Sequence, residues 1–404
     1  MQEFRAWIES RFPDVICQPS GLMRHPYISL GSHYGVGGQT FFWDAFFSAM
    51  RLSHSGFVEP IQGLLFCYLD HMDPRTGQVP RVLSPTAFVD RLDEQQIQPF
   101  LCQLAYLADR MSSVADRADF LLDRLTTYLG FWDARRRTSL GLYRWLDSYE
   151  SGIDSNLAVA CFAPLTVAGV DLNTYLVLEY RALASLAETW GKEDQSRAWR
   201  SRAEELAEAI RASMWNEERE LFCNLDTCSG ELIYRTLDHE DFCLVPWTNF
   251  TPLYARIATE EQAKATIRRY LLNRDEMRCR YGFRSFSRRS VYYTEARICP
   301  PANLSMRPGL KTASNWSGPV WTLANYILAH GLASYGFRDE ALAVAGETAE
   351  VNWQSIRNDG AMFECYHPET GKGLWAEGYF SWNLLADCLA DEIRGTLPRP
   401  VDLP

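Results

Sequence analysis

The sequence predicts an all-α protein, a toroid of about twelve helices with six inner and six outer members. Apolar residues recur at spacings of three and four through most of the 404 residues, while sustained period-two alternation is scarce. The helical stretches also follow one another as consecutive pairs separated by longer loops. One or two helices are expected near Ala6 and Thr251, and the eleven clearest are expected at residues 41–53, 58–69, 98–111, 115–132, 156–168, 172–190, 196–214, 260–272, 320–330, 338–353 and 379–393.

The chain is expected to form one domain over residues 1–396, because no linker, low-complexity tract or further repeat interrupts the helix pairs. Asp171 is expected to cap the helix that follows it. Residues 274–314 are poorly helical, and such a long loop inside a domain predicts a substrate lid. Residues 397–404, which contain two prolines besides the terminal one, predict a C-terminal tail.

Composition limits the classes of partner and the compartment. Apolar residues make up 47% of the chain and charged residues 23%, which is enough for an ordinary globular core. The net charge of −11 repels phosphate backbones and anionic lipid, so neither nucleic acid nor a membrane is expected as a partner. The charged N-terminus does not resemble a secretory signal, and eleven scattered cysteines without a C-x-x-C pair fit a reducing compartment. We therefore expect a cytoplasmic location.

No metal ion and no cofactor are predicted from the sequence. Cys223 and Cys228 are the closest pair of thiols, but their spacing and the lack of a nearby histidine do not fit a zinc site. A dense cluster of Asp and Asn residues, as in a calcium loop, is not found either.

Four segments place Trp, carboxylate, Gly and amide residues in loops or at helix ends. Sugars need such a mixture, because their C–H faces stack on aromatic rings while their hydroxyls need hydrogen-bonding groups. The segments therefore predict a carbohydrate site. They are Gly37-Gly38-Gln39-Thr40-Phe41-Phe42-Trp43-Asp44, Tyr149-Glu150-Ser151-Gly152-Ile153-Asp154-Ser155-Asn156, Asn315-Trp316-Ser317-Gly318-Pro319-Val320-Trp321, and Phe363-Glu364-Cys365-Tyr366-His367-Pro368 leading to Gly378-Tyr379-Phe380-Ser381-Trp382.

Two carboxyl groups in these segments are candidates for glycoside hydrolysis, which needs one protonated and one ionised carboxyl. Asp154 follows the apolar Ile153 in a loop near Tyr149, and such surroundings would raise the pKa of an acid. The alternative interpretation is that Asp154 or Ser155 caps the following helix. Glu364 is the candidate base, and its alternative is a solvated loop glutamate.

Other carboxylates in the segments are ambiguous in the same way. Asp44, beside Trp43, either caps a helix or grips sugar hydroxyls, and Glu150 and Glu377 have similar alternatives. The residues alone therefore indicate an aromatic and carboxylate site for a carbohydrate, without a reaction.

The four segments resemble the motifs of the inverting (α/α)6-barrel glycosidases of glycoside hydrolase family 63 and the related trehalases. Within that clan the chain is most similar to short bacterial members such as mannosylglycerate and glucosylglycerate hydrolases. Phe42-Trp43-Asp44 is similar to the sugar-gripping W-D motif, Glu150–Asp154 to the E-S-G-x-D motif that carries the general acid, and 315–321 to the W-x-G-P-x-W motif. Phe363-Glu364-Cys365-Tyr366 is similar to the segment of the general base, with the F-S-W motif at 380–382 following it.

The resemblance implies an inverting mechanism with Asp154 as general acid and Glu364 as general base, without a metal ion. It also implies a set of substrate-binding residues that face one pocket, which we expect to include Phe42, Trp43, Asp44, Arg81, Gln98, Tyr149, Glu150, Gly152, Trp316, Gly318, Trp321, Tyr366 and Trp382.

The chain departs from the family pattern at positions that bear on the substrate. Ser317 stands where Arg is frequent, and Gln96-Ile97-Gln98-Pro99 lacks the Arg and Ser of the corresponding segment. Arg81, Gln98 or Arg284 are expected to supply the missing hydroxyl contacts. An anionic aglycone would need arginines at the pocket mouth, for which Arg81, Arg284 and Arg307 are available.

The predicted function is hydrolysis of a small α-linked glucoside or mannoside, a disaccharide or a glycosyl small acid. A sugar epimerase or isomerase on the same barrel is one alternative, but that chemistry uses paired histidines, and of seven histidines only His367 falls in the four segments. A non-catalytic carbohydrate-binding protein is the other, and it would have no use for two opposed carboxylates.

Overall fold

Helices dominate the structure, a computed structural model in which residues 1–31, 38–86, 95–295 and 315–403 are described. This agrees with the period of the apolar residues. The α-helices are α1 (Gln2–Ser10), α2 (Phe12–Val15), α3 (Phe42–Ser53), α4 (Val58–His71), α5 (Leu101–Met111), α6 (Ala118–Arg135), α7 (Leu157–Ala160), α8 (Val170–Thr189), α9 (Glu193–Ser213), α10 (Thr251–Tyr254), α11 (Glu260–Thr266), α12 (Thr322–Ser334), α13 (Arg338–Asp359) and α14 (Leu389–Arg394).

Shorter helices of other types lie next to some of these α-helices. They are the 3₁₀ helices η1 (Ala115–Arg117), η2 (Glu240–Phe242), η3 (Trp247–Phe250) and η5 (Ser381–Asp387), and the π-helix η4 (Ile267–Leu271).

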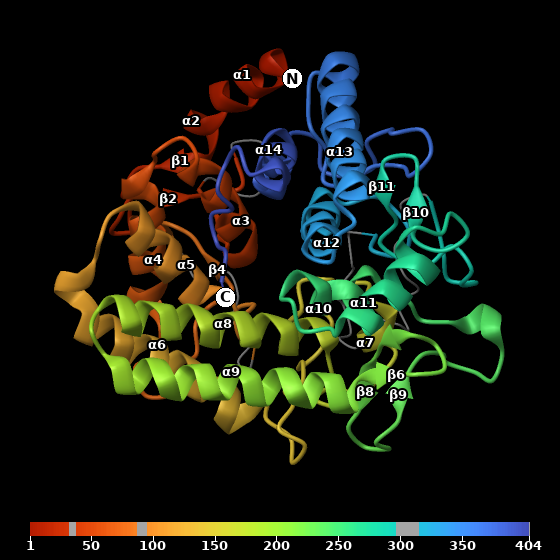
Figure 1. The fold of residues 1–404 in the computed structure, drawn as a ribbon. Coiled ribbons are helices and arrows are strands. Elements are labelled where there is room, and N and C mark those ends of the chain that lie inside the picture. The colour runs from red at the N-terminus through yellow and green to blue at the C-terminus, as the bar shows by residue number, and fades with distance from the viewer. Residues whose placement is uncertain (32–37, 87–94, 296–314, 404) are drawn as a thin grey trace.

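The inner wall of the barrel is a closed ring. In the described part of the chain, α3, α5, α8, α10, α12 and η5 contact one another in this order, and η5 returns to contact α3. A second layer surrounds the ring, with α4 on α3 and α5, α6 and α9 on α8, α13 on α12, and α1 on η5. Figure 1 shows the ring with α1 to α3 in red beside the blue C-terminal helices. The predicted (α/α)6 barrel is confirmed.

The position of a helix in the ring explains its sequence. Most side chains of the inner helix α8 are buried, and its buried residues lie on every side of the helix and include the polar Asp171, Asn173 and Glu179. The outer helix α9 buries a stripe formed by Trp199, Ala203, Leu206 and Ile210, at spacings of three and four. A helix that covers a core on one side needs only such a stripe.

The helix predicted at 156–168 is wrong beyond its first turn. Only α7 is helical there, and Val167–Ala168 form a strand instead. Pro164 has no backbone N–H to donate and disfavours a helical conformation at the residue before it. Leu165 then takes a left-handed conformation (φ 60°), which turns the chain away from the helix axis.

The helix predicted at 379–393 is also wrong in its first half, where the 3₁₀ helix η5 precedes α14. Ser381 has a φ of 32°, which is incompatible with an α-helix that starts at Tyr379. Asp171 is not an N-cap either, because α8 begins one residue earlier and its N-cap is Gly169. Helix α13 extends to Asp359, past the predicted end, and stops at Gly360 with a φ of 77°.

Short antiparallel strands, which the sequence did not predict, connect the helices. They form four two-stranded sheets and one three-stranded sheet in the described residues. The pairs are β1 (Ile16–Cys17) with β2 (Tyr27–Ile28), β3 (Thr40–Phe41) with β4 (Val82–Leu83), β6 (Trp215–Asn216) with β7 (Leu221–Phe222), β10 (Arg278–Cys279) with β11 (Gly282–Phe283), and β8 (Asn224–Asp226) between β5 (Val167–Ala168) and β9 (Leu232–Ile233).

The structure describes most of the predicted tail but only part of the predicted lid. Residues 397–403 pack on the barrel, because Val401 and Leu403 are buried and the Arg399 guanidinium lies 3.9 Å from the Tyr254 ring centroid. The expected lid is described only as far as residue 295, where it contains the β10–β11 hairpin, and 296–314 lie outside the described residues. Among the described helices, we find none with the length and apolar character of a membrane span.

Candidate active site

One small cavity brings together residues from all four segments. Its volume is about 210 Å³, and both candidate catalytic carboxyl groups lie on its wall, although they are far apart in the sequence. The cavity is lined by Leu30, Phe41, Trp43, Asp44, Arg81, Tyr149, Gly152, Asp154, Trp316, Glu364, Tyr379 and Trp382.

Three tryptophans make much of the cavity wall. The Trp43 ring centroid lies 5.3 Å from that of Trp382 and 6.1 Å from that of Trp316. Trp321 stacks on Trp316 with the centroids 3.5 Å apart and the planes 8° from parallel. Because Trp321 does not line the cavity, it supports the Trp316 ring from behind, and the contact with substrate predicted for it is not supported.

The loop that carries Asp154 is fixed by its own side chains. Asp147 Oδ1 accepts the backbone N–H of Glu150, and the Ser151 hydroxyl donates to the carbonyl of Ser148. The next helix is capped by Asn156, whose side chain accepts from the backbone of Ala158. The alternative that Asp154 or Ser155 caps this helix is therefore wrong, and Ser155 instead accepts the N–H of Trp316.

Glu150 connects this loop to Arg136, which directly follows α6, and to Gln96. Its buried carboxylate accepts from Arg136 Nη2 at 2.7 Å, from the Leu146 N–H at 2.6 Å and from the Gln96 N–H at 3.0 Å. Burial raises the pKa of Glu150, while the charge of Arg136 opposes that shift. Since these bonds are all to protein groups and Glu150 does not line the cavity, it is a positioning residue.

Glu364 is buried and lies in a short paired segment, so the alternative of a solvated glutamate is wrong. Its N–H donates to the carbonyl of Trp375, and Tyr366 exchanges two backbone hydrogen bonds with Val320, which lies two residues before α12. Asn383 in η5 donates to the carbonyl of Phe363. The segment of the base candidate is thus held by η5 and by the residues that precede α12.

Asp44 faces the cavity from the first turn of α3. Its Oδ1 accepts from the hydroxyls of Tyr379 and Ser381, and α3 is preceded by Phe41, so Asp44 does not cap the helix. Burial raises the pKa of Asp44 to about 6, although the two hydroxyls and the nearby Arg81 lower it.

Replacing Asp44 with Asn should stabilise the fold at neutral pH. Because the folded-state pKa of Asp44 lies above its ordinary value, the cost of this carboxyl to stability is absent below about pH 4, grows as the pH rises to about 6, and stays constant above that. The Asn Oδ1 can still accept from Tyr379 and Ser381. We expect the unfolding free energy of Asp44→Asn, relative to the parent, to rise by about 1–3 kcal/mol between about pH 4 and pH 7.5. Urea denaturation at several pH values measures this, and parallel curves would contradict it.

Six predicted substrate-binding residues lie behind the cavity wall. Besides Glu150 and Trp321, Phe42 packs edge-on against Tyr68 in the core, and Gln98 donates to the carbonyl of Glu150. The Gly318 N–H donates to Ser285, and the Tyr366 hydroxyl donates to Asn352 on α13. A motif predicts that a residue lies near the site, but it does not predict which way the side chain faces. These six residues contact the residues behind the wall and do not line the cavity.

Of the three arginines expected at the pocket mouth, Arg81 is the one that the structure places on the cavity wall. Arg81 lines the cavity, and its Nη1 donates to Gln95 Oε1 at 2.7 Å. Arg284 is buried away from the cavity, paired with Glu369 and the Tyr293 hydroxyl, so the prediction for it is wrong. Arg307 lies outside the described residues.

Three wall residues were not among the predicted site residues. Phe41 and Tyr379 belong to the quoted aromatic segments, so their aromatic character was a usable signal. Leu30 precedes the first of these segments and carries no pattern that indicates a site.

The model of one protein family covers most of the chain. The model of the mannosylglycerate hydrolase MGH1-like glycoside hydrolase domain matches residues 39–383. A mannosylglycerate hydrolase of Rubrobacter radiotolerans is 30% identical over 231 residues, which are 56% of this chain and 45% of that protein. Mannosylglycerate hydrolase MGH1 of Selaginella moellendorffii is 33% identical over 141 residues, 35% of this chain and 24% of that protein. The chain thus aligns with less than half of the length of these relatives.

Solved structures share the fold at low sequence identity. The mannosylglycerate hydrolase of Thermus thermophilus in complex with glucose has a TM-score of 0.69 at 18% identity, covering 98% of this chain and 100% of that one. Neutral trehalase Nth1 of Saccharomyces cerevisiae has a TM-score of 0.66 at 16% identity, covering 93% and 76%. Since the family model spans most of the sequence, the chain belongs to the mannosylglycerate hydrolase MGH1-like glycoside hydrolase family.

Proposed function

We propose that this chain is an inverting glycoside hydrolase that cleaves a small α-linked glucoside or mannoside. In this proposal Asp154 protonates the glycosidic oxygen and Glu364 activates a water molecule on the opposite face of the sugar. The single observation that carries the proposal is the presence of both carboxyl groups on one tryptophan-lined wall. Inversion needs about 6.5–9.5 Å between the two carboxyl groups, which leaves room for the water.

The two groups have different surroundings, as an acid and a base require. Asp154 is half-buried at the cavity, whereas Glu364 is buried. Their loops are fixed by hydrogen bonds within the protein, so the groups are held in place before a substrate binds.

The substrate is a monosaccharide unit joined to a small group. A cavity of about 210 Å³ is smaller than the roughly 300–1,000 Å³ of drug-sized sites and suits one sugar ring. Asp44 supplies a carboxylate for hydroxyls, and Trp43, Trp316 and Trp382 supply faces for C–H groups. Arg81 is a cation on the same wall, and a guanidinium pairs well with a carboxylate, which favours a glycosyl small acid such as mannosylglycerate.

A panel of α-mannosyl and α-glucosyl glycerates and α-linked disaccharides tests this function. We expect release of free monosaccharide from at least one member, with the β-anomer appearing first in proton NMR spectra because inversion changes the configuration. First appearance of the α-anomer would contradict the inverting mechanism. Epimerised sugar, or binding without turnover across the panel, would contradict hydrolysis itself.

Substitution of Gly152 should disturb the acid loop. Gly152 has a φ of 78°, and a Cβ there would lie 2.8 Å from Cζ2 of Trp43 and 3.0 Å from Gln98 Nε2. Gly152→Ala should therefore lower kcat about 10²-fold, the size expected when catalytic groups move by about 1 Å.

Gly141→Ala is the matched control, because Gly141 has the same φ of 78° but faces open space. Both variants carry the strain of a left-handed alanine, about 1–2 kcal/mol. Only Gly152→Ala should lose turnover, and equal kcat values in the two variants would contradict the packing argument.

A further inference from the structure

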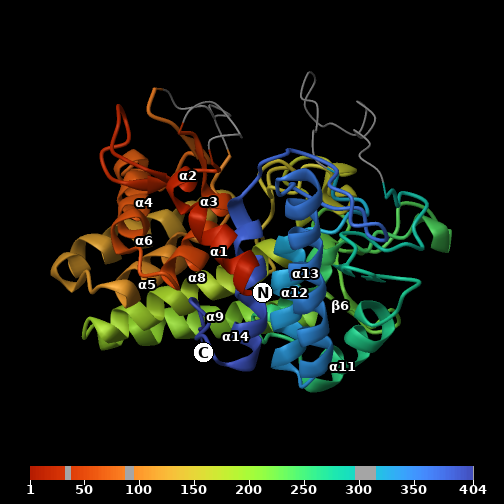
Figure 2. The same ribbon diagram turned by 90° about the horizontal axis from the view of Figure 1, so that it is seen from above.

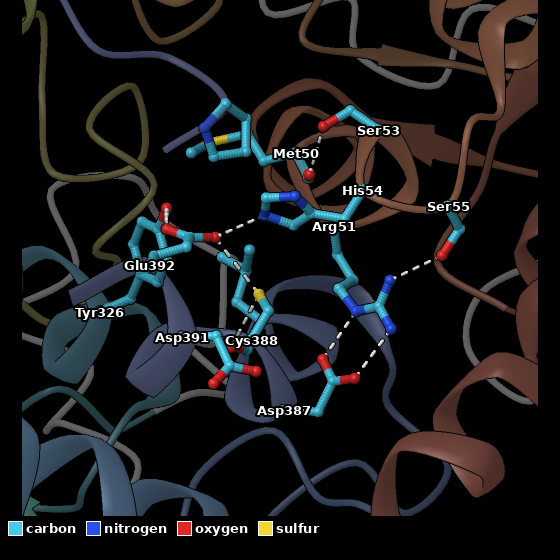
Figure 3. A network of polar contacts seen from close by, with 12 residues as sticks. Met50, Arg51, Ser53, His54, Ser55, Tyr326, Asp387, Cys388, Asp391 and Glu392 are labelled. Carbon is cyan, nitrogen blue, oxygen red and sulfur yellow. Dashed lines mark hydrogen bonds and ion pairs between the residues drawn. The ribbon is translucent and has the colours of Figure 1, made fainter. Parts of the chain in front are cut away.

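A cluster of side chains that commonly bind metals lies away from the catalytic cavity. His54 follows α3, Cys388 lies between η5 and α14, and Glu392 is in α14. Figure 2 shows α14 and the C-terminus on the lower side of the molecule, while the yellow loops near residue 150 lie on the upper side. Figure 3 shows the three side chains pointing toward one another. We propose that His54, Cys388 and Glu392 bind one divalent metal ion of the zinc class.

The geometry of the donors carries the proposal. One imidazole nitrogen, one sulfur and one carboxylate oxygen lie within 4.8 Å of one another in the part of the chain that is described. His54 Nε2 is 2.8 Å from Glu392 Oε1, and Cys388 Sγ is 3.3 Å from the same oxygen. Bonds of roughly 2.0–2.3 Å to a tetrahedral zinc ion place the donors about 3.5 Å apart. The His54 and Cys388 donors therefore need to move away from Glu392 Oε1 by only about half an ångström, and they already lie within 4.8 Å of each other.

The carboxylate is held in the orientation that a ligand needs. Its second oxygen, Oε2, accepts from the Tyr326 hydroxyl at 2.6 Å and from His330 Nε2 at 2.9 Å. Both donors come from α12. Outer partners of this kind fix the orientation of ligands in metal sites. They turn Oε1 toward His54 and Cys388, which leaves the fourth tetrahedral position to a water molecule.

Burial and charge select a soft divalent cation. Glu392 and Cys388 are buried, and the His54 side chain keeps 8% of its surface exposed, which gives an ion a route from solvent. The neighbouring carboxylate of Asp387 is already paired with Arg51 at 2.6 Å. On binding, the Cys388 thiol releases its proton to solvent, so one thiolate and one carboxylate neutralise the charge of the ion. Mixed N, S and O donors suit zinc and cobalt, and not calcium or magnesium.

Cobalt(II) binding to the full chain tests the site. All proteins carry Cys228→Ser and Cys299→Ser, because Cys228 is exposed and Cys299 lies outside the described residues. We expect one ion per chain by elemental analysis and a sulfur-to-cobalt charge-transfer band in the near ultraviolet. Zinc should displace the cobalt and abolish the band.

Two substitutions and one control locate the ion. Cys388→Ser should remove the charge-transfer band, and His54→Gln should weaken cobalt binding by about tenfold or more. Cys223→Ser should change neither, because Cys223 is equally buried but lies outside the cluster. Circular dichroism checks that each variant is folded. If Cys388→Ser or His54→Gln does not fold, Glu392→Gln is measured in its place, and it should also weaken cobalt binding because Glu392 is the third ligand.

Absence of stoichiometric cobalt in the parent protein would overturn the proposal and leave a hydrogen-bonded cluster only. A band that persists in Cys388→Ser would overturn it as well. Because the readout is metal binding, the result does not depend on the proposed glycosidase activity.

Discussion

Asp154→Asn should lower kcat/KM on an unactivated glycoside by about 10²–10⁴-fold, because an amide cannot give a proton to the leaving oxygen. The fold should be unchanged, since the hydrogen bonds that fix the loop are made by neighbouring residues such as Asp147 and Asn156. In a glycosyl fluoride the leaving group is the fluoride ion, which departs without being protonated. The loss of rate on the fluoride should therefore be much smaller than the loss on the unactivated glycoside.

The control for this substitution is Asp123→Asn, which changes an exposed carboxylate on α6. It should leave both rates unchanged. If Asp154→Asn hydrolyses the unactivated glycoside at the parent rate, or loses equal activity on both substrates, Asp154 is not the general acid.

Glu364→Gln should lower kcat by a similar factor, about 10²–10⁴-fold, on both the glycoside and the fluoride. Water attacks in both reactions, and a glutamine side chain cannot accept its proton. Azide needs no deprotonation, so added azide should restore turnover and give a glycosyl azide of inverted configuration. Rates are followed by product release, and NMR identifies the anomer of the azide.

Glu377→Gln is the matched control, because Glu377 is an exposed glutamate in the same region of the chain and lines a different cavity. It should keep the parent rate without azide. The general acid is the residue whose loss is much smaller on the fluoride than on the glycoside. If Glu364→Gln shows this difference between the two substrates, as expected for Asp154→Asn, the acid role belongs to Glu364 instead.

The fold could be predicted from the sequence wherever a helix has a continuous apolar period. The long helices α8, α9 and α12 were found for this reason. Tertiary contacts decide the remaining elements. The helix expected near Thr251 is the four-residue α10, and the helix expected at 379–393 begins as the 3₁₀ helix η5, in which the Ser381 hydroxyl donates to Asp44. The contact between Ser381 and Asp44 leaves no periodic pattern in the sequence.

The site was predictable to the level of segments, but not always to the level of side chains. The motif that contains Asp154 also contains Glu150, yet Asp154 lines the cavity while Glu150 does not line it and is bonded to Arg136. Leu30 could not be found, because an isolated leucine has many equivalent places in a core. The zinc-class cluster was missed for another reason, since 338 residues separate His54 from Glu392.

The closure of the ring by η5 on α3 has a consequence for biosynthesis. Trp382 and Glu364 complete a wall that Trp43 begins, and the buried Arg51–Asp387 pair joins the same two regions. During translation the N-terminal helices emerge long before their last partners exist. The cavity therefore cannot form until residue 382 has left the ribosome, and the exposed apolar faces of the nascent helices must be protected from aggregation until then.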